Sequence, residues 1–293
     1  MKKIYKAVIP AAGFGTRLLP VTKAVPKEML PIVDAPAIDY VVEECIASGI
    51  TEICIIVSKG KDSILSYFGT NEELNNALKK SNKTRELALV EKYKGKANFT
   101  FVTQKEMRGT AKAIELCKDF TGDDPFVVLF PDDVVYSEVP VAKQLIAAYE
   151  TTGSTIVGCQ HRPKEMCVYY GIMSPISTSG KYTLIDGFKE KPTIEEVNCT
   201  LTSLGRFLLT SDIYDYLDKA PVMDNGEAYL PSAIDVMAKA QKVYAYEFDG
   251  VRYDMGSKIG YLEANIEYTL RNTSSREELI VYLEKLAKNG YNV

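Results

Sequence analysis

The sequence has little histidine, no long apolar run and no block of basic residues, and each of these shortages excludes a class of protein. Its single histidine, His161, argues against a histidine-rich metal site and against a Ser-His-Asp triad. A membrane-spanning helix needs roughly 20 consecutive apolar residues, and the sequence contains no such run. Nucleic-acid binding depends on clustered positive charge, whereas 35 basic and 39 acidic side chains give a net charge of −4. We therefore expect neither a membrane protein nor a nucleic-acid-binding protein.

The cysteines do not show the spacing of a redox or zinc motif. No two of them form a C-x-x-C pair, and most lie in apolar periodic segments; they are Cys45, Cys54, Cys117, Cys159, Cys167 and Cys199. This pattern is typical of reduced thiols in a protein core. The first residues lead directly into a strand-like segment, with no long apolar stretch of the kind found in a secretory signal. We expect a cytoplasmic protein.

The sequence does contain enough apolar residues for a large core. Hydrophobic residues make up 46% of the 293 positions, which excludes intrinsic disorder. In the first half, short apolar runs at 5–10, 53–57, 99–102 and 126–130 alternate with helical patterns at 38–46, 71–93 and 110–117. This alternation predicts an α/β fold with a doubly wound, Rossmann-like sheet, which binds ligands beyond the carboxyl ends of its strands.

After about residue 154 the pattern changes to short strands separated by turns. Strand-like segments occur at 154–160, 168–173, 182–188 and 202–209, and we interpret them as antiparallel additions to the same mixed sheet. Helices are expected at 211–217, at 230–240 and from about Lys258. The chain is therefore predicted to form a single domain over 1–272. An amphipathic helix should follow over 273–293, opened by a capping box of Ser274 and Glu277.

The first strand runs into a loop that contains Gly13 and Gly15, followed by Thr16 and Arg17. Glycine lets the backbone approach a ligand closely, so that consecutive N–H groups can hold phosphate oxygens. A dinucleotide-binding fingerprint would need a third glycine where Leu18 stands, and a Walker-type loop would need Gly-Lys-Ser/Thr after four spacer residues. Neither is present, and the loop alone is equally consistent with a plain turn.

Lys27 lies a short distance downstream, in a segment that Pro26 and Pro31 make stiff. Together with Arg17 it would neutralise a triphosphate, because a guanidinium binds as a planar fork and an ammonium as a compact point charge. The alternative is a pair of solvated surface cations.

Together, the segments Gly13-Phe14-Gly15-Thr16-Arg17 and Pro26-Lys27-Glu28-Met29-Leu30-Pro31 resemble the signature of the sugar-1-phosphate nucleotidylyltransferases. The Lys-Glu-Met-Leu-Pro form is similar to that of the bacterial UTP–glucose-1-phosphate uridylyltransferases (UDP-glucose pyrophosphorylases) within that family. The resemblance extends from about Lys6 to Tyr268, and several separated motifs occur in the family's order. It implies a fold of the nucleotide-diphospho-sugar transferase type, with a nucleotide half at about 1–150 and a sugar-binding half at about 151–272.

The resemblance also implies a role for each matching residue. The nucleotide-binding residues would be Ala11, Ala12, Gly13, Gly15, Gln104 and Gly109, with Gln104 on the uracil edge. The catalytic cations would be Arg17 and Lys27 on the triphosphate, and Lys191 on the phosphate of glucose 1-phosphate. The sugar-binding residues would be Gly171, Glu190, Lys191 and Gly205, and Asp132 and Asp254 would bind Mg2+.

The position of Asp132 supports this assignment independently of the family. It follows the buried run 126–130, and the carboxyl ends of strands are where α/β folds bind ligands. Mg2+ takes oxygen ligands and usually keeps several waters. The plainer alternatives are a polar strand end for Asp132, an ordinary turn for Asp254, a solvated ion pair for Glu190-Lys191, and packing for tyrosines such as Tyr170.

The implied reaction is transfer of UMP from UTP to glucose 1-phosphate, which yields UDP-glucose and pyrophosphate. The sugar phosphate would attack the α-phosphorus of UTP in line. Because the nucleophile is already an anion, we expect no general base and no covalent enzyme intermediate. Two alternatives stay open: a sister enzyme that uses dTTP, CTP, ATP or another sugar phosphate, and a non-catalytic sensor of sugar nucleotides.

Two segments depart from the family's usual pattern. Gly109-Thr110-Ala111-Lys112-Ala113 stands where the family has Gly-Leu-Gly-His-Ala, which leaves the choice of base open. Glu227-Ala228-Tyr229-Leu230-Pro231-Ser232 stands where it has Glu-x-Gln-Leu-Thr-Asp, which leaves the hexose or the subunit packing open.

Members of the family often form dimers or tetramers, so the resemblance implies a homo-oligomer. In the amphipathic segment 274–286, Leu279, Leu283 and Leu286 fall on one face. This face either packs within the chain or docks a second subunit.

Overall fold

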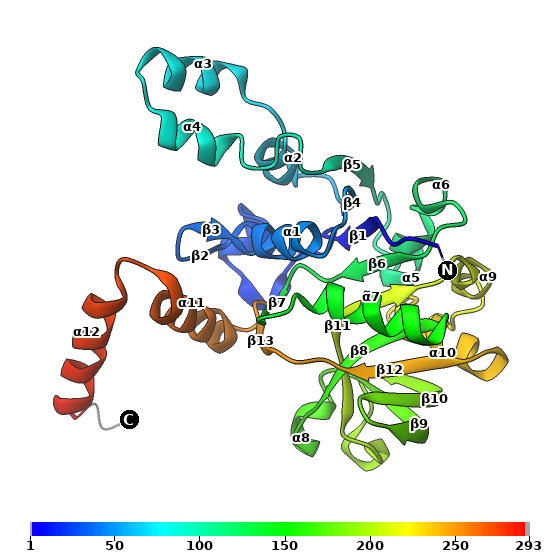
Figure 1. Cartoon of the computed structure of the whole chain (residues 1–293). Coiled ribbons are helices and arrows are strands. Elements are labelled where there is room, and N and C mark those ends of the chain that lie inside the picture. The colour runs from blue at the N-terminus through cyan, green and yellow to red at the C-terminus, as the bar shows by residue number, and fades with distance from the viewer. Residues whose placement is uncertain (1, 291–293) are drawn as a thin grey trace.

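In the computed structural model, which describes residues 2–290, the molecule is built around a nine-stranded mixed sheet (Figure 1). The strand order is β5-β4-β1-β6-β11-β8-β12-β10-β9. These strands are β1 (Lys6–Pro10), β4 (Glu52–Val57), β5 (Asn98–Thr103), β6 (Phe126–Leu129), β8 (Thr155–His161), β9 (Gly171–Ser179), β10 (Tyr182–Glu190), β11 (Leu201–Leu209) and β12 (Val243–Glu247). Strands β5, β4, β1 and β6 are parallel, and β11 lies antiparallel between β6 and β8. The predicted α/β class with antiparallel additions is confirmed.

Helices cover both faces of this sheet, which explains the continuous apolar runs of its parallel strands. In β1, Val8 packs into one apolar cluster with helices α5, α9 and α10, whereas Ala7 and Ile9 pack into a second cluster with α1 and α7. The helices are α1 (Ala37–Ala47), α2 (Asp62–Phe68), α3 (Glu72–Lys80), α4 (Thr84–Val90), α5 (Thr110–Glu115), α6 (Lys118–Thr121), α7 (Val141–Thr152), α8 (Lys164–Cys167), α9 (Tyr214–Leu217), α10 (Leu230–Ala240), α11 (Lys258–Asn272) and α12 (Arg276–Lys288). In the described residues, no helix combines the length and apolarity needed to cross a bilayer.

Two elements differ from the sequence-based expectation. The helical stretch predicted over 71–93 is two helices, α3 and α4, because Asn82 between them adopts a left-handed conformation with φ of 54°. This helix pair extends away from the sheet at the top of Figure 1. The strand predicted at 168–173 begins only at Gly171, since the short helix α8 and a turn precede it.

A small antiparallel ribbon connects distant parts of the chain at the edge of the fold. It pairs β7 (Asp133–Tyr136) with β13 (Val251–Asp254), so that Asp254 lies opposite Asp133. A second short ribbon pairs β2 (Pro31–Ile32) with β3 (Ala35–Pro36). The first ribbon carries Asp254 to the carboxyl end of β6, which no local pattern in the sequence predicted.

The last two helices, α11 and α12, extend from the β13 side of the molecule (Figure 1). The leucines at 279, 283 and 286 are half-buried. The predicted capping box is wrong, because α12 begins at Arg276 after Ser275 and no side chain caps it. The helix predicted over 273–293 also includes 291–293, which lie outside the described residues.

Candidate active site

The residues singled out in the sequence gather at a cleft beyond the carboxyl ends of β1, β5 and β6. Two adjoining cavities, of about 270 and 330 Å³, share the lining residues Phe130, Asp132, Glu190, Lys191 and Pro231. The first, which we call the Gln104 cavity, is also lined by Ala12, Gly13, Lys27, Gln104 and Gly109. The second, the Gly171 cavity, is also lined by Arg17, Gly171, Gly205 and Asp254.

The glycine loop folds back onto the segment that carries Lys27. Gly15 has a φ of 68°, and a Cβ there would lie 3.2 Å from the Lys27 Cβ, which is a tight contact. The Thr22 hydroxyl donates to the Gly15 carbonyl at 2.9 Å and holds the turn. The Arg17 side chain is 63% exposed, and its guanidinium lies 3.5 Å from Asp254 and 4.0 Å from Asp132. The loop therefore presents one cation to both carboxylates.

Two of the predicted nucleotide-binding residues do not line either cavity. Ala11 is fully buried, and its carbonyl accepts a hydrogen bond from Lys61 Nζ at 2.5 Å. Gly15 is not among the lining residues and supplies the turn described above. Both residues shape the loop that presents Ala12 and Gly13 to the Gln104 cavity.

Lys27 and Asp132 form an ion pair at the boundary of the two cavities. Lys27 Nζ donates to Asp132 Oδ2 at 2.5 Å. Burial raises the pKa of Asp132, but the charge and hydrogen bond of Lys27, with Arg17 beyond it, outweigh burial and lower that pKa to about 2. For Lys27, burial lowers the pKa and Asp132 more than reverses this, so the pKa is raised. Both groups are therefore ionised at neutral pH.

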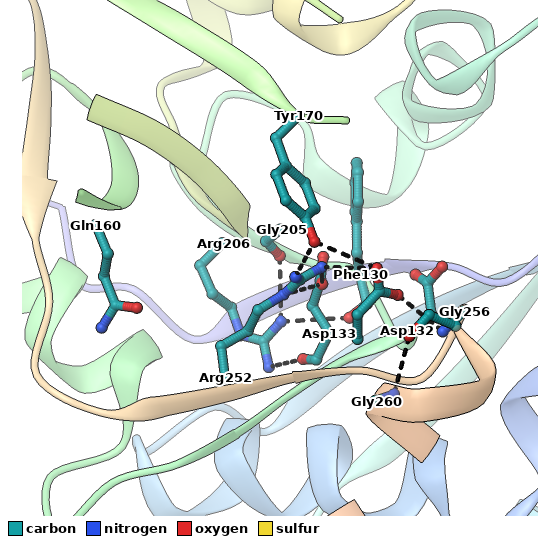
Figure 2. A network of polar contacts seen from close by, with 12 residues as sticks. Phe130, Asp132, Asp133, Gln160, Tyr170, Gly205, Arg206, Arg252, Gly256 and Gly260 are labelled. Carbon is teal, nitrogen blue, oxygen red and sulfur yellow. Dashed lines mark hydrogen bonds and ion pairs between the residues drawn. The ribbon is translucent and has the colours of Figure 1, made fainter. Parts of the chain in front are cut away.

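Asp254 belongs to a polar network built on β13 and the residue before β9 (Figure 2). Its Oδ1 accepts the N–H of Gly256 at 2.9 Å, and its Oδ2 lies 3.3 Å from the Tyr170 hydroxyl. Arg252 is nearly buried, donates to the Tyr170 hydroxyl at 2.6 Å and pairs with Asp133. These contacts hold Asp254 facing the Gly171 cavity.

A buried arginine supports the chain beneath this network. Arg206 on β11 is fully buried and pairs with Glu44 of α1 at 2.8 Å. It also donates to the carbonyls of Phe130 and Asp133 (Figure 2). Gly205 beside it has a φ of 68°, and a Cβ there would overlap the Asp133 carboxylate. Because Arg206 bonds the backbone on both sides of Asp132, it fixes where that carboxylate lies.

Glu190 is the last residue of strand β10 and Lys191 follows it, and both line the two cavities. The Glu190 side chain is 17% exposed, and burial raises its pKa, an effect that Lys191 partly offsets. The Lys191 side chain is 58% exposed, and its Nζ lies 4.0 Å from Glu190. Gly171 packs closely against Phe188, because a Cβ there would overlap the Phe188 ring.

Gln104 and Gly109 form the far wall of the Gln104 cavity. Gln104 follows β5, its N–H donates to the Val57 carbonyl at 2.8 Å, and its Nε2 lies 3.4 Å from the Gly109 carbonyl. Gly109 has a φ of 90°, which favours glycine. The predicted nucleotide-binding residues that line a cavity, Ala12, Gly13, Gln104 and Gly109, therefore all line the Gln104 cavity.

Four residues of the site were not predicted from the sequence. Asp133, Tyr170 and Arg252 belong to the network around Asp254, and Tyr170 was interpreted as packing. Glu28 is buried against Lys61 at 2.8 Å, and its Oε1 has no hydrogen-bond partner in the described residues although Glu28 lines the Gln104 cavity. The available signal was position: Asp133, Tyr170 and Glu28 adjoin predicted site residues, and Arg252 lies two residues before Asp254.

The carboxylates of Asp132 and Asp254 fit a Mg2+ ion. Both lie within 4.0 Å of the same Arg17 guanidinium, so they face a common space. No group of three or more His, Cys, Asp or Glu side chains within residues 2–290 is arranged to hold a metal. A cation held by two carboxylates would take its other ligands from phosphate oxygens and water, as Mg2+ commonly does.

The cleft lies beyond the carboxyl ends of the parallel strands, where α/β proteins bind ligands, and its cations and carboxylates suit a phosphate ligand. The Nucleotidyl transferase family matches residues 6–271. The chain belongs to this family and is a nucleotidyltransferase.

Within the family, the relatives of the chain have a more specific name. A protein named UTP–glucose-1-phosphate uridylyltransferase 2 from Staphylococcus saprophyticus is 44% identical over 289 residues, which are 99% of this chain and 100% of the relative. The UTP–glucose-1-phosphate uridylyltransferase of Bacillus subtilis is 41% identical, with 98% of each chain covered. The resemblance identified in the sequence is confirmed.

Solved structures agree with this relationship. A UDP-glucose pyrophosphorylase complexed with UDP-glucose superposes with a TM-score of 0.82 at 34% identity, covering 92% of this chain and 100% of the other. A UTP-bound UGPase from Acinetobacter baumannii superposes with a TM-score of 0.89 at 31% identity, covering 97% and 100%.

Proposed function

We propose that the protein is a UTP–glucose-1-phosphate uridylyltransferase, which transfers UMP from UTP to glucose 1-phosphate and releases pyrophosphate. One observation carries the proposal: five charged side chains from distant parts of the chain converge on one cleft. They are Arg17, Lys27, Asp132, Lys191 and Asp254. The names of the relatives specify which nucleotide and which sugar phosphate meet there.

In this proposal the nucleotide half, about 1–150, contributes most of the Gln104 cavity, and the sugar-binding half, about 151–272, most of the Gly171 cavity. The base and ribose of UTP occupy the first cavity, beside Gln104 and Gly109. The hexose occupies the second, where Glu190 accepts from sugar hydroxyls and Gly171 and Gly205 form part of the wall. The reacting phosphates meet at the shared wall, which Asp132 and Lys191 line.

Catalysis then consists of bringing two anions together and stabilising the charge of the transferring phosphoryl group. Lys191 holds the attacking phosphate. Arg17 and Lys27 hold the triphosphate, with Lys27 kept in place by Asp132. No side chain needs to remove a proton, because the attacking oxygen is ionised at neutral pH.

We propose Mg2+ as the cofactor, held by Asp132 and Asp254. When bound, it supplies positive charge that stabilises the transferring phosphoryl group. The support is the pair of carboxylates that faces one guanidinium, Arg17, across a shared space.

We also propose a cytoplasmic homo-oligomer. The cysteines are free thiols, which suits a reducing compartment. Large apolar side chains lie exposed on the last two helices: Ile259 and Leu262 on α11, and Val281 and Tyr282 on α12. Light scattering over a range of concentrations tests the oligomer, and a monomer mass at every concentration would refute it.

A pyrophosphate-release assay tests the function. UTP, dTTP, CTP and ATP are each paired with glucose 1-phosphate and with other hexose 1-phosphates, and kcat/KM is compared. We expect the highest value for UTP with glucose 1-phosphate. A higher value for another pair would indicate a sister enzyme, and binding of UDP-glucose without any turnover would indicate a sensor.

A further inference from the structure

The two segments that depart from the family's pattern pack against each other. Ala228 donates its N–H to the Arg108 carbonyl at 2.9 Å, and its carbonyl accepts the N–H of Ala111 at 3.0 Å. The Thr110 hydroxyl accepts the N–H of Leu230 at 2.9 Å. These bonds join the loop of the Gln104 cavity to the start of α10, so the two departures form one structural unit.

This unit positions the ring of Tyr229, which lies between Ala228 and Leu230. The Tyr229 hydroxyl donates to Glu227 Oε2 at 2.6 Å and accepts from Asn225 Nδ2 at 2.7 Å. Lys191 Nζ lies over the ring, 5.6 Å from its centroid. An ammonium at this distance from an aromatic face is attracted by the ring quadrupole.

Lys191 has few other restraints. Its Nζ makes no hydrogen bond to any side chain in the described residues, and its nearest carboxylate, on Glu190, is 4.0 Å away. Its backbone N–H donates to the Tyr170 carbonyl at 3.0 Å, which fixes the backbone but not the ammonium. The Tyr229 ring is therefore the contact that selects where the ammonium lies.

We propose that Tyr229 is a positioning residue that holds the Lys191 ammonium at the site of the sugar phosphate, and that Thr110 fixes Tyr229 from the nucleotide side. The inference rests on the proposed function, because it assigns the phosphate of glucose 1-phosphate to Lys191. In this proposal Thr110 and Tyr229, which both differ from the family's pattern, act together to position Lys191. Sugar-phosphate binding then depends on a residue of the base-binding loop.

The first test compares two substitutions of the tyrosine. A surface cation–π contact contributes about 0.5–1 kcal/mol, so Tyr229→Leu should raise KM for glucose 1-phosphate about two- to fivefold, with KM for UTP changed less. Tyr229→Phe keeps the ring but loses the bonds of the hydroxyl to Glu227 and Asn225, so its KM should lie between those of the wild type and Tyr229→Leu. Tyr216→Leu, which removes the ring 4.9 Å from Lys219 outside the cleft, is the matched control. An unchanged KM in Tyr229→Leu, or equal losses in the Phe and Leu variants, would overturn the proposal.

The second test is a double-mutant cycle with Thr110. Thr110→Val removes the acceptor of the Leu230 N–H, whereas Thr110→Ser keeps it. We expect the Val variant to raise KM for glucose 1-phosphate when Tyr229 is present, and to add nothing further in the Tyr229→Leu background. Additive effects would refute the role of Thr110.

A third readout does not depend on activity. In NMR spectra, the Lys191 Cε protons should show a ring-current shift that Tyr229→Leu removes and Tyr229→Phe keeps. Absence of turnover in the wild type would refute the proposed function alone, whereas a shift that is insensitive to Tyr229→Leu would refute the positioning contact alone.

Discussion

The two lysines that face the cleft are held in opposite ways. Lys27 has a side chain only 16% exposed and bonds Asp132 at 2.5 Å. Lys191 is 58% exposed and lies 4.0 Å from Glu190, above an aromatic ring. The cation on the nucleotide side of the cleft, Lys27, thus belongs to a buried ion pair. The cation on the sugar-phosphate side, Lys191, is exposed at the surface of the cavity. Removing one partner of the buried Lys27–Asp132 pair should therefore lower stability and turnover together, whereas removing the exposed charge of Lys191 should lower turnover alone.

The largest effect is expected for Asp132→Ala. It removes a proposed metal ligand and leaves Lys27 as a buried cation without its partner. Turnover should fall a hundredfold or more, and the free energy of unfolding should fall by about 1–3 kcal/mol because a buried charge loses its hydrogen bond. Steady-state kinetics and chemical denaturation measure the two losses. Turnover close to wild type would show that Asp132 has no role in the mechanism. Unchanged stability would show that Lys27 is not held by a stabilising ion pair, in contrast to what we propose.

Lys191→Ala should also lower turnover a hundredfold or more, but with an unchanged melting temperature. Its side chain is exposed and forms no close ion pair, so removing it leaves nothing buried without a partner. Lys189→Ala, two residues earlier and within β10, loses a surface pair with Glu196; it is the matched control and should keep full turnover. Near-normal activity of Lys191→Ala would refute its role in holding the phosphate.

A pair of glycine substitutions tests whether the nucleotide wall is rigid. Gly109→Ala places a Cβ against the Ala228 carbonyl at a φ of 90°, so we expect a loss of about 2 kcal/mol in stability. Gly13→Ala meets no atom within 4 Å and should leave stability within about 0.5 kcal/mol. Its methyl group adjoins the Gln104 cavity, however, and should raise KM for UTP. Equal stability of the two variants, measured by denaturation, would contradict the close packing at Gly109.

The smallest effect is expected for Glu190→Gln, and it depends on pH. Burial raises the pKa of Glu190 above the ordinary value of 4.5, with Lys191 partly opposing the shift. The folded protein therefore binds this proton more tightly than the unfolded chain, so the stability that this group contributes is fully present below about pH 4.5 and is lost as pH rises through the raised pKa. An amide cannot ionise, so at about pH 7 the Gln variant should be more stable than the wild type.

Denaturation at two pH values measures this effect. The advantage of the variant should disappear at about pH 4, where the wild-type carboxyl is protonated. Turnover should fall, since Glu190 is proposed to bind sugar hydroxyls. If the variant is less stable than wild type at about pH 7, the buried carboxylate of Glu190 does not destabilise the folded protein.

Much of the fold could be predicted, because its signals are local. The run of Ile53 to Val57 needs apolar neighbours on both faces, and only a covered parallel sheet supplies them. The break between α3 and α4 was missed, since a single Asn82 in a polar stretch gives little warning of a left-handed turn. The pairing of β7 with β13 joins segments more than a hundred residues apart, and no local pattern specifies such a partner.

The residues of the candidate site that belong to local motifs could be predicted, whereas those whose partners are distant in the sequence could not. Asp132 and Lys27 were named from motifs, and their ion pair agrees with the expected triphosphate region. Arg252, although adjacent to Tyr253-Asp254, was missed because its partner Asp133 becomes its neighbour only when the ribbon forms. The pairing of Lys61 with Glu28 was missed for the same reason, since the interaction depends on how α2 docks against the loop.

The backbone of Lys191 has a φ of 43°, a left-handed conformation that costs a residue with a Cβ about 1–2 kcal/mol and glycine almost nothing. A library screened only for cellular abundance should therefore enrich glycine at this codon, while a screen that requires the product should retain lysine. The two screens would then select different amino acids at this position: glycine for abundance of the folded protein, and lysine for formation of the product.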